Sequence, residues 1–346
     1  MKYPVSKPNL KKNELRYVTK AVKSGWVSSK GEYIEKFEKL FAKKHGMKYG
    51  IACSSGTTAL TLALASLGIK KGDEVIVPEF TMIATAWVVS YLGAKPVFVD
   101  CDKRFLIDID KIKITPKTKA IIPVHIYGRQ CDMKAIKKLG LKIVEDSCEA
   151  IGVKPEGDIA CYSLFANKII TAGEGGICLT NNKKLAEKMK YLRAMAFDPD
   201  HTFLHKEIGF NFRMTNLQAA VALAQTERLK KFLEKRKKIE KWYDQYLAGI
   251  KEIRIMPKRK VLWQYDILVE NREELMKFLA KNGIETRRFF KPMSQQLMYL
   301  GNYKKTMAYC YSLFGLYLPT YYDLTEKDVK FICNKIREFY ENASCG

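Results

Sequence analysis

The chain has 346 residues, 47% of them hydrophobic, which is enough for a large buried core. A chain of this length is too long to be a short binding module. Its net charge of +24 admits nucleic acid, an anionic surface or an acidic small substrate. Because lysines are spread along the whole chain, a solvated basic surface is favoured over a nucleic-acid-binding face. No apolar run reaches the roughly 20 residues of a membrane span or forms a signal core, and the 9 cysteines form no CxxC pair, so we expect a cytoplasmic protein with reduced cysteines and no metal site.

Two amphipathic helices are the first elements that we expect, one ending at Gly25 and the other near Gly46. From about residue 48 to residue 181, short apolar runs alternate with helical segments. This alternation indicates a mostly parallel sheet covered by helices on both faces, whose ligands bind beyond the carboxyl ends of the strands. The expected strands are YGIAC, EVIVP, PVFVD, AIIPVH, KIVED, IACYSLF and GICLT.

The rest of the chain predicts a bridge and a second, smaller unit. A long amphipathic helical region is expected over residues 215–243, with Thr215 as its N-cap. Beyond it, the strands EIRIM and QYDILV and helices over residues 273–281 and 325–340 predict a small α/β unit. We place the domain boundary near residue 245. The two expected domains are a large domain over residues 1–245 and a small C-terminal domain over residues 246–346.

A polar turn follows the first strand, at residues 54–60 (SSGTTAL). Its small residues let the backbone approach an anion, and the free N–H groups of the following helix, with the hydroxyls of Thr57 and Thr58, can bind a phosphate. A capped helix after a tight turn has the same sequence pattern. This segment alone therefore leaves a phosphate site and a simple helix cap equally open.

Two charged residues follow later strands. Asp146 ends KIVED, where a carboxylate can hold a pyridine nitrogen protonated or can simply cap a helix. Lys168 lies among apolar residues ahead of the glycine-rich sequence GEGG, unlike the surface lysines elsewhere in the chain. An apolar environment makes a lysine amine more nucleophilic, so Lys168 is a candidate Schiff-base lysine.

At this point the sequence resembles the DegT/DnrJ/EryC1/StrS sugar aminotransferases, which are fold type I enzymes dependent on pyridoxal 5'-phosphate (PLP). The resemblance covers nearly the whole chain and is most like the perosamine-synthase branch and its 4-aminotransferase relatives. It implies a large domain with a mostly parallel sheet between helices and a smaller C-terminal α/β domain. The segments that carry it include SGWVSSKGEYIEKFEKLFA, SSGTTAL, GDEVIVPEFTMIATA, PVHIYGRQCDM, VEDSCEAIG, YSLFANKIITAGEGGICLTN, GFNFRMTNLQAA and GIETRRFFKPMSQQ.

The resemblance also implies roles for single residues. Lys168 matches the lysine that bonds covalently to PLP, and Asp146 matches the partner of the pyridine nitrogen. Asn211 matches an asparagine that reaches the phosphate of a neighbouring subunit, which implies a homodimer with shared active sites. Glu149 matches a polar position near the cofactor. The positions expected around the phosphate are Gly56, Thr57, Thr58 and Ser163.

The chain departs from the family pattern at two further positions. Met82 stands where an aromatic residue often stacks on the cofactor ring, so a thioether would make that contact. Ser294 replaces the histidine of a C-terminal PLH-type sequence, which puts the sugar contacts there in doubt. Related dehydratases carry histidine in place of Lys168, so the lysine argues for amino transfer.

The expected substrate contacts are Trp26, Ser29, Arg213 and Ser294. For His125 we expect a structural role rather than general-base catalysis.

The function that the resemblance implies is a ping-pong transamination. L-Glutamate would supply an amino group to a 4-keto-6-deoxy sugar carried on a nucleoside diphosphate, with Lys168 moving the proton. Two alternatives remain at this stage: a 3-aminotransferase acting on another nucleotide keto sugar, and a basic regulatory or nucleic-acid-binding protein on the same scaffold. The presence of Lys168, Asp146 and Asn211 favours the enzyme.

Overall fold

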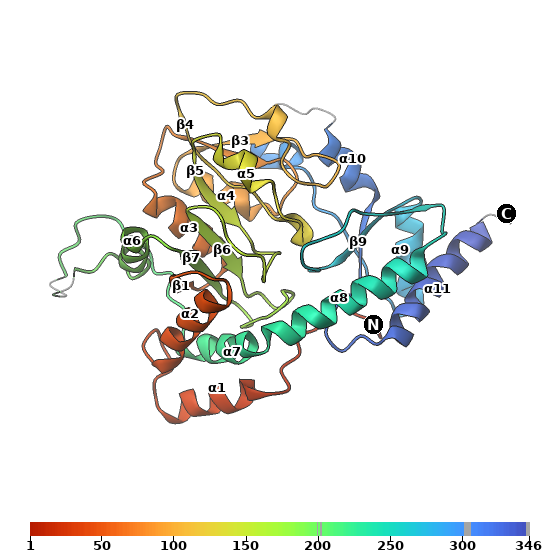
Figure 1. Cartoon of the computed structure of the whole chain (residues 1–346), viewed down its shortest axis with the longest axis horizontal. Helices are drawn as coiled ribbons and strands as arrows, with labels where there is room; N and C mark the ends of the chain where they lie inside the picture. The colour runs from red at the N-terminus through yellow and green to blue at the C-terminus, as the bar shows by residue number, and fades with distance from the viewer. Residues whose placement is uncertain (199, 201–202, 301–305, 344–346) are drawn as a thin grey trace.

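The computed structural model describes residues 1–198, 200, 203–300 and 306–343. A seven-stranded sheet with the order β1-β7-β6-β5-β4-β2-β3 forms its centre (Figure 1). Strand β7 is antiparallel to β1 and β6, and the other neighbouring strands are parallel, so the predicted mostly parallel sheet is confirmed. The strands are β1 (Tyr49–Cys53), β2 (Glu74–Pro78), β3 (Lys95–Val99), β4 (Thr118–Ile121), β5 (Lys142–Asp146), β6 (Ile159–Ser163) and β7 (Gly176–Thr180).

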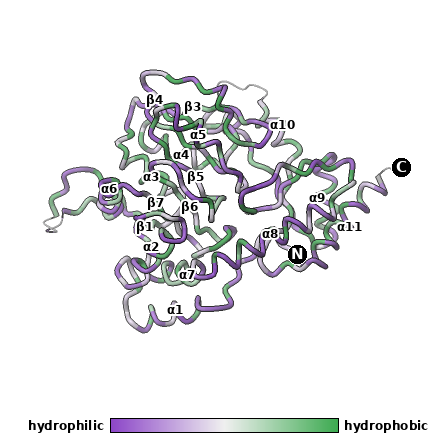
Figure 2. The backbone as a smooth tube through the Cα atoms, viewed as in Figure 1, coloured by the Kyte–Doolittle hydropathy of each residue, from purple (hydrophilic) through white to green (hydrophobic). Residues whose placement is uncertain are grey.

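Two hydrophobic cores lie on the two faces of this sheet. Successive strand residues point to opposite faces, so Ile143 packs in the core with helices α2 and α7, while Val144 packs in the core with α3, α4 and α6. Figure 2 shows hydrophobic and hydrophilic residues alternating along the outer helices, as an element with one buried face requires. The helices of this region are α1 (Asn13–Lys23), α2 (Glu32–Lys44), α3 (Gly56–Ser66), α4 (Ala84–Tyr91), α5 (Met133–Lys137), α6 (Lys183–Arg193), α7 (Asn216–Glu227) and α8 (Leu229–Leu247).

The helical region predicted over residues 215–243 is divided into α7 and α8 at Arg228. Thr215 caps α7 as expected, through a capping box with Gln218. The guanidinium group of Arg228 bonds to the Asn9 side chain and to Glu14, so the break lies where the N-terminal segment is anchored. The expected amphipathic pattern holds for α8, which buries one face, but not for α7, which is buried almost all round, including every residue from Ala222 to Thr226.

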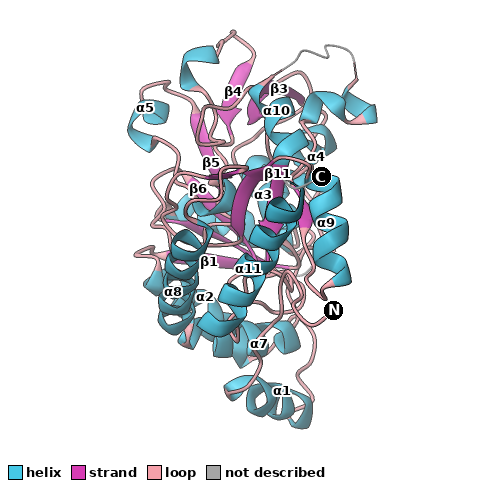
Figure 3. Ribbon diagram, turned by 90° about the vertical axis from the view of Figure 1, so that its right-hand side faces the viewer, coloured by secondary structure: helices cyan, strands magenta, loops and turns pink. Residues whose placement is uncertain are grey.

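A second, antiparallel sheet follows α8, with the order β10-β11-β9-β8. Helices α8, α9 and α11 share a hydrophobic core with it, and Figure 3 shows α9 and α11 on the same side of the molecule as β11. The sequence patterns missed β10, β11 and α10, which are short. The elements are β8 (Ile253–Ile255), β9 (Tyr265–Val269), α9 (Arg272–Lys281), β10 (Arg287–Arg288), α10 (Met307–Phe314), β11 (Gly315–Leu318) and α11 (Glu326–Ala343).

The domain boundary near residue 245 stays a prediction; α8 ends at Leu247 and the first strand of the second sheet begins at Ile253. Within the described part of the chain, no helix combines the length and the apolar character that crossing a membrane requires. Among the described residues there are also four 3-10 helices: η1 (Ile109–Lys111), η2 (Ile126–Gly128), η3 (Met293–Gln295) and η4 (Leu297–Tyr299).

Candidate active site

A cavity of about 510 Å³ lies beyond the carboxyl ends of β1, β5 and β6, where the parallel sheet was expected to bind a ligand. Residues from the second sheet region also line it, so both parts of the chain form its walls. Seven of the residues predicted around a cofactor lie on this cavity: Gly56, Thr57, Met82, Asp146, Glu149, Ser163 and Lys168.

The N-terminus of α3 forms one end of the cavity. Ser55 caps the helix by accepting a hydrogen bond from the Thr58 amide at 3.1 Å, and Thr58 Oγ1 accepts one from the Ser55 amide at 2.9 Å. Thr58 therefore stabilises the turn and does not itself line the cavity. A Cβ atom at Gly56 would lie 2.8 Å from Ser163 Cβ, so only glycine fits between the helix and β6. This close approach leaves the helix N-terminus, with its free N–H groups and positive dipole end, facing the cavity.

Asp146 is held in a fixed orientation at the end of β5. Its carboxylate is buried, with 5% of the residue exposed. Thr85 Oγ1 donates to Oδ2 at 2.8 Å, and the Cys148 amide donates to Oδ1 at 3.1 Å. Thr85, from α4, lies in the segment GDEVIVPEFTMIATA, but the sequence alone assigned it no role. Both carboxylate oxygens are thus oriented by donors that belong to the protein itself.

Lys168 lies against an aromatic ring from the other part of the chain. Its Nζ atom is 4.3 Å from the centre of the Trp263 ring, and the Trp263 Nε1–H group donates to the Asn167 carbonyl at 3.0 Å. A cation over an indole face is attracted by the ring quadrupole, so Trp263 both orients the amine and fixes the backbone beside it. Tyr317, on β11, also lines the cavity and donates to Tyr127 Oη at 2.9 Å. Sequence patterns missed Trp263 and Tyr317.

Glu149 and Met82 lie at different depths of the same cavity. Glu149 is 5% exposed, and its Oε2 accepts a hydrogen bond from the Tyr127 amide at 2.8 Å. Burial raises the pKa of Glu149 to about 7, although the charge of Lys168 and the Tyr127 hydrogen bond act in the opposite direction. Met82 is half exposed, as expected for a side chain at the cavity mouth.

Several predicted site residues lie outside the cavity of their own chain. Asn211 is exposed and accepts a hydrogen bond from Arg213 Nε at 3.0 Å. Trp26 lines a separate surface hollow beside Asn216. The Ser294 amide and hydroxyl both bond to buried Glu79 rather than pointing into the cavity. Ser29, before α2, does not reach the cavity either.

Each ring nitrogen of His125 has a hydrogen-bond partner. Its Nε2 lies 2.7 Å from Glu145 Oε2, and its Nδ1 accepts a hydrogen bond from the Cys131 amide at 3.2 Å. Because Nδ1 accepts that bond, Nε2 carries the proton, and the Nε2–H group donates a hydrogen bond to Glu145. The imidazole is completely buried and does not line the cavity, so the arrangement supports a structural role.

A family model described as the DegT/DnrJ/EryC1/StrS aminotransferase family matches residues 8–337. The chain belongs to this family. It is 43% identical over 351 residues to GDP-perosamine synthase from Caulobacter vibrioides, with 94% of this chain and 95% of the relative covered. It is 40% identical over 364 residues to GDP-perosamine synthase from Escherichia coli O157:H7, with 99% and 100% covered. A solved sugar aminotransferase from Streptococcus pneumoniae, in its PLP form, matches with a TM-score of 0.91 at 27% identity, with 99% of each chain covered.

These similarities confirm the family, the fold type I architecture and the prediction of a PLP-dependent aminotransferase. The described residues also fit the cofactor chemically. The N-terminus of α3 lines the cavity at Ser55, Gly56 and Thr57, and the free N–H groups of this phosphate cradle suit a phosphate. Asp146 presents an oriented carboxylate for a pyridine nitrogen, and Lys168 supplies an amine on the same cavity.

Proposed function

We propose that this aminotransferase moves an amino group from L-glutamate to C4 of a 4-keto-6-deoxy sugar linked to a nucleoside diphosphate. The observation that carries the proposal is the convergence of Lys168, Asp146 and the α3 N-terminus on one cavity, in a chain similar over nearly its full length to GDP-perosamine synthases. The names of these relatives favour guanine as the base and C4 over C3 as the position of amination.

Different residues of the cavity would perform different steps of the reaction. PLP, when bound, withdraws electrons from the carbon that carries the amino group. Asp146 would hold the pyridine nitrogen protonated, and its two hydrogen bonds from Thr85 and Cys148 keep the carboxylate aligned for this. In each half-reaction Lys168 Nζ would carry a proton between the substrate carbon that bears the nitrogen and the aldehyde carbon of the cofactor, because it lies on the same cavity as Asp146 and is oriented by Trp263.

Positive charge at the cavity rim suits a diphosphate. Arg287 and Arg288 of β10 line the cavity and are exposed. Each has one carboxylate neighbour, Glu285 for Arg287 and Glu273 for Arg288. An exposed ion pair contributes little, so both guanidinium groups can still receive phosphate oxygens. These arginines support a substrate that carries a diphosphate, such as a nucleotide-linked sugar. The described residues of the cavity show no feature specific to nucleic acid.

We also propose that the active unit is a cytoplasmic homodimer in which Asn211 completes the partner's phosphate site. In its own chain Asn211 is exposed and does not line the cavity. Earlier in the same segment of the chain, Phe203, Leu204 and Ile208 are 78%, 65% and 89% exposed, and apolar side chains this exposed are typical of a surface that another chain covers. Trp26, Ser29, Arg213 and Ser294 stay predictions for substrate contacts.

The reaction can be tested by offering GDP-, UDP- and dTDP-linked 4-keto-6-deoxyhexoses, with glutamate as the donor. We expect amination of the GDP sugar, with the product nitrogen placed at C4 by mass spectrometry and NMR. An amine at C3 would instead establish the 3-aminotransferase. A purified protein that stays colourless with added PLP would support the regulatory alternative.

The shared site can be tested by mixing inactive Lys168→Ala chains with inactive chains that carry an Asn211 substitution. If Asn211 serves the partner, a mixed dimer has one site with both lesions and one intact site, so about a quarter of all sites in a random mixture regain activity. If Asn211 serves its own chain, every site keeps one lesion. No recovery after demonstrated subunit exchange would reject the shared site.

A further inference from the structure

A second cavity, of about 300 Å³, lies at the junction of the two sheet regions and away from the active site. One wall comes from segments that follow strands of the large sheet, and the other comes from the loop that precedes β9. Five basic side chains line it, and we call it the basic cavity. They are Arg104, Arg129, Lys258, Arg259 and Lys260.

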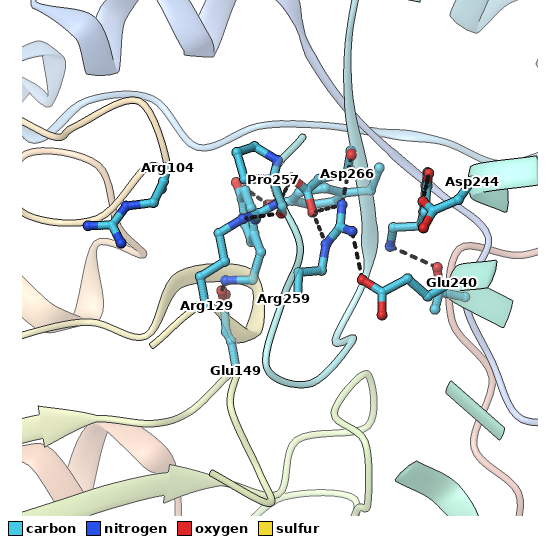
Figure 4. Close-up of polar contacts among 12 residues, drawn as sticks. Arg104, Arg129, Glu149, Glu240, Asp244, Pro257, Arg259 and Asp266 are labelled. Carbon is cyan, nitrogen blue, oxygen red and sulfur yellow. Dashed lines mark hydrogen bonds and ion pairs between the residues drawn. The ribbon is translucent and has the colours of Figure 1, made fainter. Parts of the chain in front are cut away.

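The two arginines at the inner wall of the basic cavity are buried, and they differ in how completely their N–H groups are bonded. Figure 4 shows Arg129 and Arg259 converging on Asp266, with Glu240 beside Arg259. Arg259 uses Nε, Nη1 and Nη2 in bonds to these two carboxyl groups and to the Asp266 carbonyl. Arg129 uses Nη2 for Asp266 at 2.9 Å and Nε for the Pro257 carbonyl at 3.0 Å.

The remaining nitrogen of Arg129 has no acceptor. The residue is 3% exposed, and its Nη1 atom is buried without a hydrogen-bond partner among the described residues. A buried polar group without a partner costs about 1–3 kcal/mol, and more when it is charged. An acceptor on a ligand in the basic cavity would relieve this cost after a small shift of the side chain.

Charge at the basic cavity is unbalanced. Asp266 and Glu240 are occupied by the two buried arginines, and Asp102 is paired with Arg104. Lys258 and Lys260 are exposed, and neither forms an ion pair with any residue that the structure describes. Two uncompensated ammonium groups beside a guanidinium group with a free donor are the arrangement that binds a doubly charged anion.

We propose that the basic cavity is a second anion site, which binds the phosphate group of a small molecule at the junction of the two sheet regions. Phosphate offers several acceptor oxygens and about two negative charges, which match the two lysines and the spare donor of Arg129. Apart from Leu106 and Cys131 the lining is polar or charged, and no aromatic ring lines the cavity. The recognised feature is therefore the phosphate, not a stacked nucleobase.

The test is calorimetric titration of the PLP-loaded enzyme with inorganic phosphate and with pyrophosphate, in a buffer free of both. We compare the wild type with Lys258→Gln/Lys260→Gln. The matched control is Lys277→Gln/Lys281→Gln, which removes the same charge from exposed lysines of α9. We expect saturable binding that is about tenfold weaker or more in the first variant and unchanged in the control.

Equal affinity of the wild type and Lys258→Gln/Lys260→Gln would overturn the proposal, as would the lack of any saturable binding to the wild type. GDP serves as a third titrant. A lower GDP affinity in Lys258→Gln/Lys260→Gln than in the wild type would show that a nucleoside diphosphate binds at this site. GDP affinity unchanged while phosphate binding weakens would assign the site to free phosphate or a phosphorylated small molecule. Purified Lys258→Gln/Lys260→Gln should fold, because both side chains are exposed.

Discussion

Replacing Glu149 by glutamine tests how burial controls ionisation in the active site. In the folded chain the pKa of Glu149 rises from 4.5 to about 7, because burial disfavours the carboxylate more than the charge of Lys168 and the Tyr127 hydrogen bond favour it. Between these two pH values the unfolded chain releases the proton, whereas the folded chain keeps it. The unfolded state then binds fewer protons, so the free energy of unfolding falls as the pH rises.

The magnitude follows from the two pKa values. The difference between 4.5 and about 7 corresponds to about 3 kcal/mol when the pH passes through the whole interval. Between pH 5 and pH 8 the contribution of Glu149 should therefore decrease by about 2–3 kcal/mol. Glutamine has a similar shape and no titrating proton, so the Glu149→Gln chain should lack this decrease.

The measurement is urea unfolding of the cofactor-free protein at pH 5, 6, 7 and 8. The wild type should lose stability relative to Glu149→Gln as the pH rises, with most of the loss complete by pH 7. Glu187→Gln, at an exposed position on α6, is the control and should follow the wild type. If wild type and Glu149→Gln keep a constant difference across the range, the carboxyl group is not buried as the structure describes.

Three further substitutions have defined outcomes. Lys168→Ala should fold normally by circular dichroism but carry no borohydride-reduced PLP label, and a label mapped to another lysine contradicts the assignment. Thr85→Val removes a donor to the Asp146 carboxylate, worth about 1.5–3 kcal/mol, so kcat should fall roughly tenfold or more while Thr85→Ser stays near the wild type. Asp266→Asn leaves two buried arginines short of one negative charge and should lower the free energy of unfolding by about 3–5 kcal/mol; a loss below about 1 kcal/mol would be inconsistent with a buried pair.

Local sequence predicted the central sheet and part of the site because those features depend on neighbouring residues. Each strand of the large sheet is a short apolar run, and a parallel sheet brings the ends of its strands to one edge. Asp146 therefore lies on the same cavity as the turn that contains Gly56. Lys168 could be singled out because its neighbours are apolar, unlike those of the surface lysines.

The remaining features depend on contacts between distant segments. Trp263 reaches Lys168 only because the loop before β9 docks on η2, where Lys260 and Val261 donate to the Gly128 carbonyl at 2.9 and 3.2 Å. The hydrophobic periodicity of the sequence does not predict this contact between distant segments. The break at Arg228 is equally non-local, since it coincides with bonds to Asn9 and Glu14 at the start of the chain.

The docking at Gly128 has a consequence for how relatives of this enzyme can be recombined. The residue has a φ of +79°, and a Cβ there would lie 1.8 Å from the Val261 carbonyl oxygen, so the contact requires glycine. Through it, one contiguous C-terminal segment delivers Trp263, Arg287 and Tyr317 to the cavity. A chimera that exchanges this segment with that of another family member would replace one whole wall of the substrate cavity at once. Substrate preference should then follow the donor of the segment, while Lys168, Asp146 and the phosphate cradle stay with the recipient.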